Sequence, residues 1–172
     1  MSKLMLKNCR LSFPSLFEHA TYQGQDLGKY EATFLIPKDS DDAKAVQAAI
    51  KEVGMEALGR EWSKAKLCLI DGDNKDYAGY EGMFALKAST KKRPIVIDKD
   101  KSALTAEDDK PYPGCYVNTS ISVFAYTNNY GKFVQAQLNA VQFAKDGEAF
   151  GGGDSFSIDE FEDVSDDGDT PF

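Results

Sequence analysis

The amino-acid sequence predicts a mainly β domain with one main helix, followed by a disordered acidic tail. Five or more stretches have the residue pattern of strands, but only one has the 3- and 4-residue spacing of apolar side chains that marks a helix. These elements fit a small barrel or an α+β domain. The third observation is charge, because the last 27 of the 172 residues contain ten acidic residues and no Lys or Arg.

The first two strands are predicted near the N-terminus. Leu4–Phe13 is predicted to be a strand that leads into Pro14. In Leu27–Ile36 apolar side chains alternate with polar ones, and Pro37 ends the pattern. The apolar face of this second strand, which is expected to face the core, carries Tyr30, Ala32, Phe34 and Ile36.

The helix is predicted from about Asp41 to Leu58. Ser40 is a favourable N-cap residue, and the acidic side chains in the first turn lie where the helix dipole stabilises them. Gly59 is suited to end the helix. The stripe expected to face the core consists of Ala43, Val46, Ile50, Val53 and Ala57.

Three further strands are predicted at Lys66–Ile70, Tyr80–Ser89 and Pro94–Asp98, before a polar loop. The domain then ends with two long strands, Tyr116–Tyr126 and Lys132–Phe143, which flank the turn residues Asn128-Asn129-Tyr130-Gly131. One face of this hairpin is apolar, with Val117, Thr119, Ile121, Val123 and Ala125 beside Val134, Ala136, Leu138 and Ala140. The other face is predicted to carry aromatic and polar side chains, which are Tyr116, Asn118, Ser120, Ser122, Phe124, Tyr126, Phe133, Gln135, Gln137, Asn139, Val141 and Phe143.

Charge divides the chain into two parts. All 20 basic residues lie in residues 1–145 beside 18 acidic ones, so this part carries +2, whereas the last 27 residues carry −10. We therefore predict a folded domain at residues 1–146, and a flexible Gly-rich joint with an acidic tail at residues 147–172. A slightly basic domain with a separate acidic tail indicates contact with nucleic acid.

Several functional classes lack the residues that they need. No apolar run approaches the length of a membrane span, so we expect a cytoplasmic protein without a membrane partner. Cys9, Cys68 and Cys115 are far apart and are expected to be buried thiols. With a single histidine, His19, and a calcium-like loop at Asp71–Asp76 that has Lys75 at a ligand position, we expect no metal and no cofactor. The chain has no nucleophile or hydrolase motif, so we expect no enzyme activity.

Basic and aromatic residues interleave between residues 77 and 130, as binding of an unpaired strand requires. Exposed rings on a sheet stack on bases, each contributing about 1–3 kcal/mol, and clustered lysines contact phosphates. The alternatives are that the helix or a loop covers the rings and that the basic run is only solvated. The predicted DNA-binding residues are Arg10, Tyr77, Tyr80, Lys87, Lys91, Lys92, Arg93, Tyr112, Tyr116, Phe124, Tyr126 and Phe133.

Five separated blocks of the sequence resemble one family, the Enc34-type single-stranded DNA-binding proteins of phages. The blocks are Asn8–Phe17, Tyr30–Pro37, Tyr80-x-Gly82 with Arg93-Pro94, Tyr112–Asn118 and Val141–Glu148. The resemblance extends over about Leu4 to Gly153. It implies an OB-fold-like barrel that coats single-stranded DNA, without base specificity, in phage replication, recombination or repair.

The tail supports two hypotheses. The chain ends in Asp169-Thr170-Pro171-Phe172, which is similar to the acidic tip of bacterial single-strand binding proteins. The acidic run is expected to compete with DNA for the basic groove. The tip offers a ring and a terminal carboxylate to a replication or recombination protein, through the predicted partner-binding residues Asp166, Asp167, Asp169, Pro171 and Phe172. The alternative is a tail that only confers solubility.

Two other functions remain open at this point. A DNA-mimic inhibitor of a host nuclease would use carboxylates in place of phosphates, but such a protein needs acidic residues on the folded body. A strand-annealing recombination factor would share the same groove. The sequence also leaves self-association on DNA open.

Overall fold

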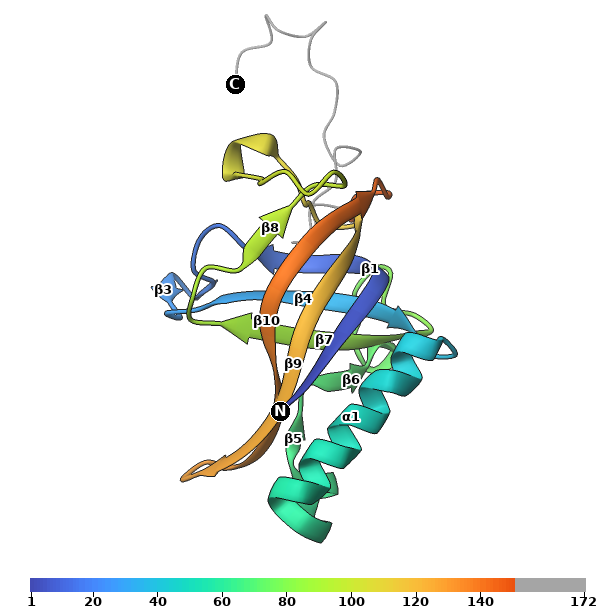
Figure 1. The fold of residues 1–172 in the computed structure, drawn as a ribbon, viewed down its shortest axis with the longest axis vertical. Helices are drawn as coiled ribbons and strands as arrows, with labels where there is room; N and C mark the ends of the chain where they lie inside the picture. The colour runs from blue at the N-terminus through green and yellow to red at the C-terminus, as the bar shows by residue number, and fades with distance from the viewer. Residues whose placement is uncertain (151–172) are drawn as a thin grey trace, which may run out of the picture.

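The computed structural model describes residues 1–150 as a closed β-barrel with one main helix (Figure 1). The mainly β architecture predicted from the sequence is therefore confirmed. The elements in chain order are β1 (Ser2–Ser15), β2 (Thr21–Tyr22), β3 (Gln25–Asp26), β4 (Tyr30–Pro37), α1 (Asp41–Leu58), a 3-10 helix (Gly59–Lys64), β5 (Lys66–Leu67), β6 (Leu69–Asp71), a 3-10 turn (Gly72–Asn74), β7 (Met83–Thr90), β8 (Ile95–Ile97), a 3-10 turn (Ala106–Asp108), β9 (Tyr116–Asn128) and β10 (Gly131–Lys145).

Five strands close the barrel in the order β1-β4-β7-β10-β9, with β9 returning to β1. The pair β7–β10 is parallel and joins Ala88 to Ala136, whereas the other four pairs are antiparallel. In chain order the five barrel strands are β1, β4, β7, β9 and β10. The third and the fifth of them therefore form the parallel pair that closes the barrel. This is the strand order of an OB-fold barrel.

Strand β1 is long because it pairs with two neighbours in turn. Its first part pairs with β9, from Ser2 opposite Val123 to Arg10 opposite Tyr116, and its second part pairs with β4. The register shifts between Leu6 and Cys9, where Asn8 has a φ of 53°, and shifts again between Ser12 and Ser15, around Phe13. Such bulges bend a strand, which lets β1 turn a corner of the barrel.

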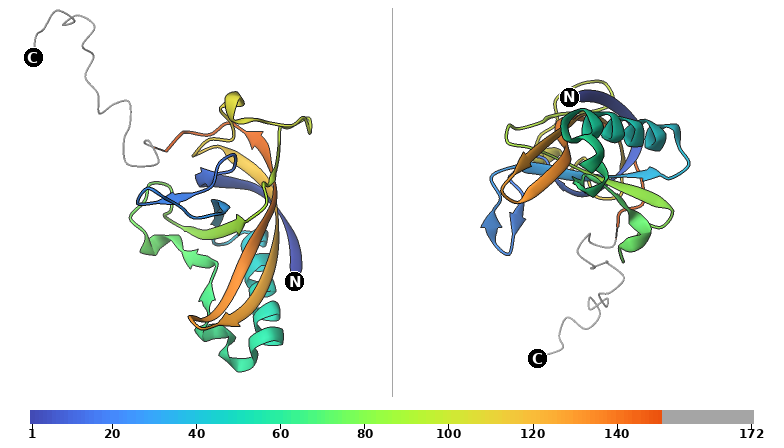
Figure 2. Two further views of the ribbon diagram at one scale, coloured as in Figure 1. Left: turned by 90° about the vertical axis from the view of Figure 1, so that its left-hand side faces the viewer. Right: turned by 90° about the horizontal axis from the view of Figure 1, so that it is seen from below.

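Helix α1 lies across the lower end of the barrel (Figure 2). The Ser40 side chain accepts a hydrogen bond from the Ala43 backbone N–H at 3.1 Å, so the predicted N-cap and both helix ends are confirmed. The buried stripe differs at its end, since Ala57 is exposed. After Gly59 the chain folds back and places Trp62 against Gly54, while Leu58 is the residue of the last turn that packs against the core.

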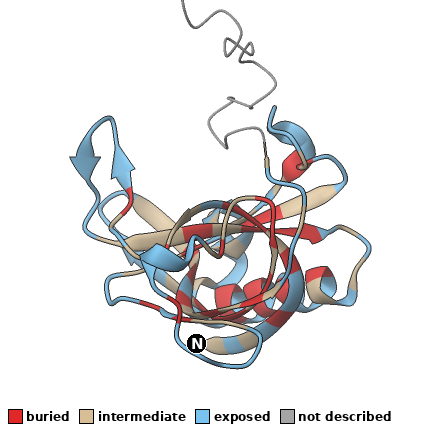
Figure 3. Ribbon diagram, turned by 90° about the horizontal axis from the view of Figure 1, so that it is seen from above, coloured by how far each residue is buried: buried red, intermediate tan, exposed pale blue. Residues whose placement is uncertain are grey.

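The core occupies the interior of the ring and the face of α1 (Figure 3). Its largest fully buried side chains include Phe34 on β4, Leu86 on β7, Ile121 on β9 and Leu138 on β10. Alternation along each strand directs these side chains inward and the intervening residues outward. The outward face of β4 and β7 is therefore available for a binding surface.

The hairpin β9–β10 agrees with the prediction up to Leu138 and differs beyond it. Asn139 is an extra residue in β10, because Leu138 pairs with Ile121 and Ala140 pairs with Ser120. One inserted residue reverses the alternation, since side chains of a strand have a period of two. Val141 and Phe143, which were predicted on the outer face, are therefore buried in the core.

Other predicted boundaries shift by a few residues. The strand predicted at Lys66–Ile70 is interrupted at Cys68, and β7 begins at Met83 because residues 77–82 form a loop instead of a strand. The first four residues of the predicted joint, 147–150, pack against the barrel. The rest of the predicted tail lies outside the described residues. Within residues 1–150, no helix is long and apolar enough to span a membrane.

Candidate nucleic-acid interface

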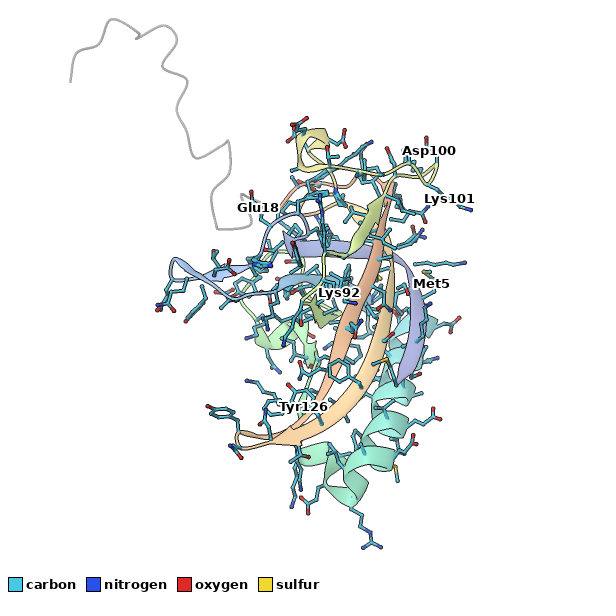
Figure 4. The ribbon with its side chains drawn as sticks, turned by 60° about the vertical axis from the view of Figure 1, so that its left-hand side comes forward. Met5, Glu18, Lys92, Asp100, Lys101 and Tyr126 are labelled. Carbon is cyan, nitrogen blue, oxygen red and sulfur yellow. The ribbon has the colours of Figure 1, made fainter. Side chains whose placement is uncertain are left out.

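The outer face of β4 and β7 is hollowed by two adjoining clefts, each of about 510 Å³. Both clefts are lined by Lys29 and Ser89, so we treat them as one surface and call it the aromatic cleft. Its walls carry six aromatic rings and six lysines and no Asp or Glu; the rings are Phe13, Tyr77, Tyr80, Phe124, Tyr126 and Phe133, and the lysines are Lys29, Lys66, Lys75, Lys87, Lys91 and Lys92. In Figure 4, Lys92 lies beside the middle of β10 and Tyr126 lies further toward the hairpin tip.

One wall of the cleft is a ladder of three rings on the hairpin β9–β10. Tyr126 and Phe133 are directly paired across the strands, and their ring centroids are 5.0 Å apart with an interplanar angle of 17°. Phe124 continues the ladder at 5.8 Å from Tyr126, also at 17°. Rings at these separations are offset, so part of each ring face is left free, and Tyr126 is 40% exposed.

The opposite wall consists of Phe13, Tyr77 and Tyr80. Tyr77 contacts the other two rings edge to face, with centroids at 5.3 Å from Phe13 and 5.1 Å from Tyr80. Tyr77 is half-exposed, whereas Tyr80 is only 3% exposed and its hydroxyl lies 2.8 Å from Ser12 Oγ. Burial raises the pKa of Tyr80. Tyr77 and Phe13 can therefore contact a ligand, and Tyr80 supports them.

Phe13 reaches the cleft through an unusual backbone conformation. Its φ is 47°, in the left-handed region that side chains other than glycine rarely adopt, and it lies in the second bulge of β1. A conformation of this kind costs about 1–3 kcal/mol and is found most often at functional sites. The bulge leaves the Phe13 side chain 44% exposed in the cleft wall, beside Tyr77.

Polar contacts fix the outer end of the loop that carries Tyr77. Lys38 forms ion pairs with Asp71 and Asp73, and Asp73 Oδ1 accepts a hydrogen bond from the Gly82 N–H at 3.0 Å. The bond from Lys38 is the main reason why the pKa of both Asp71 and Asp73 is lowered. The pKa of Lys38 is raised, chiefly by its bond to Asp71.

The lysines of the cleft provide positive charge on both sides of the rings. Lys91 and Lys92 lie at the end near Phe124, and Lys66 and Lys75 lie at the other end, near Tyr126 and Tyr77. Lys87 Nζ lies 3.5 Å from Glu31 Oε2, a buried oxygen for which residues 1–150 provide no hydrogen-bond partner. Among residues 1–150 no cluster of three or more His, Cys, Asp or Glu side chains is arranged to hold a metal ion. Cys68 lines the cleft, but burial raises its pKa to about 12, so it is a neutral thiol.

Eight of the twelve predicted DNA-binding residues lie in the aromatic cleft, namely Tyr77, Tyr80, Lys87, Lys91, Lys92, Phe124, Tyr126 and Phe133. The other four line neither part of the cleft. Arg93 is packed over the Phe17 ring, with its Cζ atom 5.8 Å from the centroid. Arg10, Tyr112 and Tyr116 surround the chain that follows β10.

The sequence did not single out several residues of the cleft. Lys29 and Thr33 occupy the polar face of the alternating strand at residues 27–36, and Lys66 and Gln135 are brought together by the parallel pair β5–β10. The alternation marks the first two as outward-facing, but only the barrel topology shows which outer face is hollowed. Phe13 has no sequence signal for its bulge.

A closed barrel of this strand order, with rings and lysines on the face of its second and third strands and on the hairpin of its last two, defines an OB-fold protein of the nucleic-acid-binding class. The chain belongs to a particular family within that class. The family model described as "Enterobacter phage Enc34, ssDNA-binding protein" matches residues 2–171. The resemblance predicted from the five sequence blocks is therefore confirmed.

Individual relatives agree with this assignment. "Putative protein p50" of Acyrthosiphon pisum secondary endosymbiont phage 1 is 45% identical over 178 residues, which cover 95% of this chain and 94% of the relative. The solved single-stranded DNA-binding protein from bacteriophage Enc34 is 29% identical with a TM-score of 0.76, covering 96% of this chain and 89% of that one. The same phage protein in complex with ssDNA is 28% identical with a TM-score of 0.74, covering 87% and 90%.

Proposed function

We propose that this protein binds single-stranded DNA in the aromatic cleft, without base specificity, during phage DNA replication, recombination or repair. The observation that carries the proposal is the combination of six rings and six lysines, with no acidic side chain, along one continuous cleft. Bases stack on Phe124, Tyr126 and Phe133, and the lysines contact phosphates. Family membership supports the same ligand.

The cleft supports binding more directly than it supports catalysis. Its lining contains aromatic, lysine, amide and hydroxyl side chains and one buried thiol, so it offers no carboxylate or histidine as a general base. A stacking surface of this kind tolerates any base, because every base has a π-face. The same groove would serve a strand-annealing factor, and an assay of annealing against simple coating distinguishes the two.

Titration with oligo-dT across a range of salt concentrations tests the proposal. Binding is expected to quench tyrosine fluorescence, to weaken steeply with salt and to be matched by oligonucleotides of other sequence, because phosphate contacts and stacking do not depend on the base. Failure to bind any single strand at low salt contradicts the proposal.

The lysines at one end of the cleft give a quantitative prediction. The slope of log K against log salt is negative. The double substitution Lys91→Gln/Lys92→Gln is expected to make it less steep by about 1.4, because each phosphate contact to a single strand contributes about 0.7. The matched control is Lys44→Gln/Lys51→Gln, which removes the same charge from helix α1 outside the cleft. Equal slopes for both double variants contradict a role of Lys91 and Lys92 in phosphate binding.

The acidic tail is proposed to compete with DNA and to dock on replication or recombination proteins. Deleting residues 154–172 is expected to tighten DNA binding at low salt, with an effect that shrinks as salt rises.

Deleting Phe172 alone is expected to leave DNA affinity unchanged but to abolish recovery of a purified phage replication protein in a pull-down. Unchanged low-salt affinity rejects competition, and equal recovery rejects docking through the tip.

A further inference from the structure

The chain that follows β10 does not leave the barrel at once. Residues 146–150, which we call the strap, run along the barrel and are held at several points. The Tyr112 hydroxyl donates to Asp146 Oδ1 at 2.7 Å and accepts from the Gly147 N–H at 3.1 Å. The Phe150 N–H donates to the Pro113 carbonyl at 3.4 Å. These bonds give the strap one defined path.

Arg10 forms the second part of this attachment. Its Nη2 donates to the Glu148 carbonyl at 2.6 Å, and its Nε donates to the Gly114 carbonyl at 3.3 Å. The same guanidinium covers the Phe150 ring, with its Cζ atom 4.1 Å from the centroid. Arg10 therefore links β1 to the strap backbone, to the strap ring and to Gly114.

Two glycines of the barrel leave the space that the strap occupies. A Cβ atom on Gly114 would overlap the Glu148 backbone, and a Cβ atom on Gly79 would overlap the Phe150 ring. Both glycines have positive φ, 101° and 85°, so the backbone conformation also favours glycine there. The barrel surface thus approaches the strap closely at two separate loops, which indicates that its shape is complementary to the strap.

The ring at the end of the strap contacts the wall of the aromatic cleft from behind. Phe150 packs on the small cluster of Leu35, Tyr80 and Ala85, and Tyr80 in turn contacts Tyr77 in the cleft. The far end of the same loop is already fixed through Asp73 and Gly82. Phe150 over Gly79 is thus the anchor at the near end, between Tyr77 and Tyr80.

We propose that Phe150, clamped by Arg10, is a positioning residue for single-stranded DNA binding: it holds the loop at residues 77–82 so that Tyr77 stands in the cleft wall. The proposal rests on the proposed function of the cleft. In this proposal Arg10, Tyr112 and Gly79 hold the strap in place and do not contact DNA directly.

The test uses full-length variants. Phe150→Ala is expected to weaken oligo-dT binding by about 2- to 30-fold, the range of coupling through packed neighbours. Hydrogen exchange of the amides at residues 77–82 is expected to rise, while exchange in the core strands stays unchanged, because only this loop loses its anchor. Phe150→Tyr keeps the ring and is expected to restore both. The control is Tyr22→Ala, which removes an exposed aromatic side chain from the β2–β3 hairpin, outside both the strap and the cleft.

Three outcomes overturn the inference. Unchanged affinity of Phe150→Ala, unchanged exchange at residues 77–82, or equal effects of Tyr22→Ala would each reject a positioning role. A rise in exchange throughout the barrel would assign Phe150 to global stability instead. Failure of the unmodified protein to bind oligo-dT is a separate result, which rejects the function of the cleft and not the attachment of the strap.

Discussion

Replacing Tyr126 with alanine is expected to weaken binding of single-stranded DNA by roughly 5- to 150-fold, since one stacked base contributes about 1–3 kcal/mol. Tyr126 is the central ring of the ladder, and its loss also leaves Phe124 and Phe133 without the neighbour that orients them. The measurement is the dissociation constant for a fluorescent oligo-dT at fixed salt.

Tyr22→Ala is the matched control for this substitution. Tyr22 is also an exposed tyrosine on a β-hairpin, 66% exposed at the end of β2, but it does not line the cleft. Its removal is expected to leave the dissociation constant within twofold of the unmodified protein. If both tyrosine variants bind oligo-dT as the unmodified protein does, the ladder is not the stacking surface.

The largest effect on stability is expected from Phe34→Ala. This side chain has no exposed surface and fills the barrel interior, so its truncation removes apolar contacts and leaves a cavity, at a cost of about 3–5 kcal/mol. That cost is a large part of the roughly 5–15 kcal/mol by which a domain is stable. Urea denaturation followed by circular dichroism measures it through the midpoint.

Thr33→Ala is the control for Phe34→Ala. It shows whether the loss of stability comes from burial of the side chain or only from its position in β4. Thr33 is the adjacent residue of β4, but its side chain lines the cleft on the outer face. Its substitution is expected to cost less than about 1 kcal/mol, since it loses only strand propensity. Similar urea midpoints for the two variants would show that the inward and outward faces of β4 are assigned wrongly.

Local signals predicted the elements of this fold well. The limits of α1 follow from Ser40 and Gly59, which act within a few residues of themselves, and the inward face of β4 follows from simple alternation. Asn139 marks where local reasoning ends. The residues around Asn139 contain no sequence signal for a bulge. The insertion is recognised only from the pairing of β10 with its partner strand β9. One such residue was enough to place Val141 and Phe143 on the wrong face.

The cleft was predictable where its residues follow one another along the chain. The rings of the hairpin could be predicted to share one face, because strand periodicity sets the face of each side chain. The lysines after β7 could be recognised because they follow one another in the sequence. Arg10 and Tyr112 are residues of the same types, but their partners are the Asp146 carboxylate and backbone atoms of residues 114, 147 and 148. Such long-range contacts depend on the closed barrel, so the sequence alone could not separate strap residues from cleft residues.

The pairing of the first strand with β9 has a consequence for synthesis of the protein. Ser2 meets Val123, and the ring closes only when Ala88 meets Ala136, so most of the chain must be complete before the barrel can form. A nascent chain that lacks β9 and β10 has neither the ladder nor a neighbour for the beginning of β1. Contacts this distant in sequence make folding slow, and they leave apolar strands exposed in the meantime. The complete binding surface can therefore form only after β10, which ends at Lys145, has been translated.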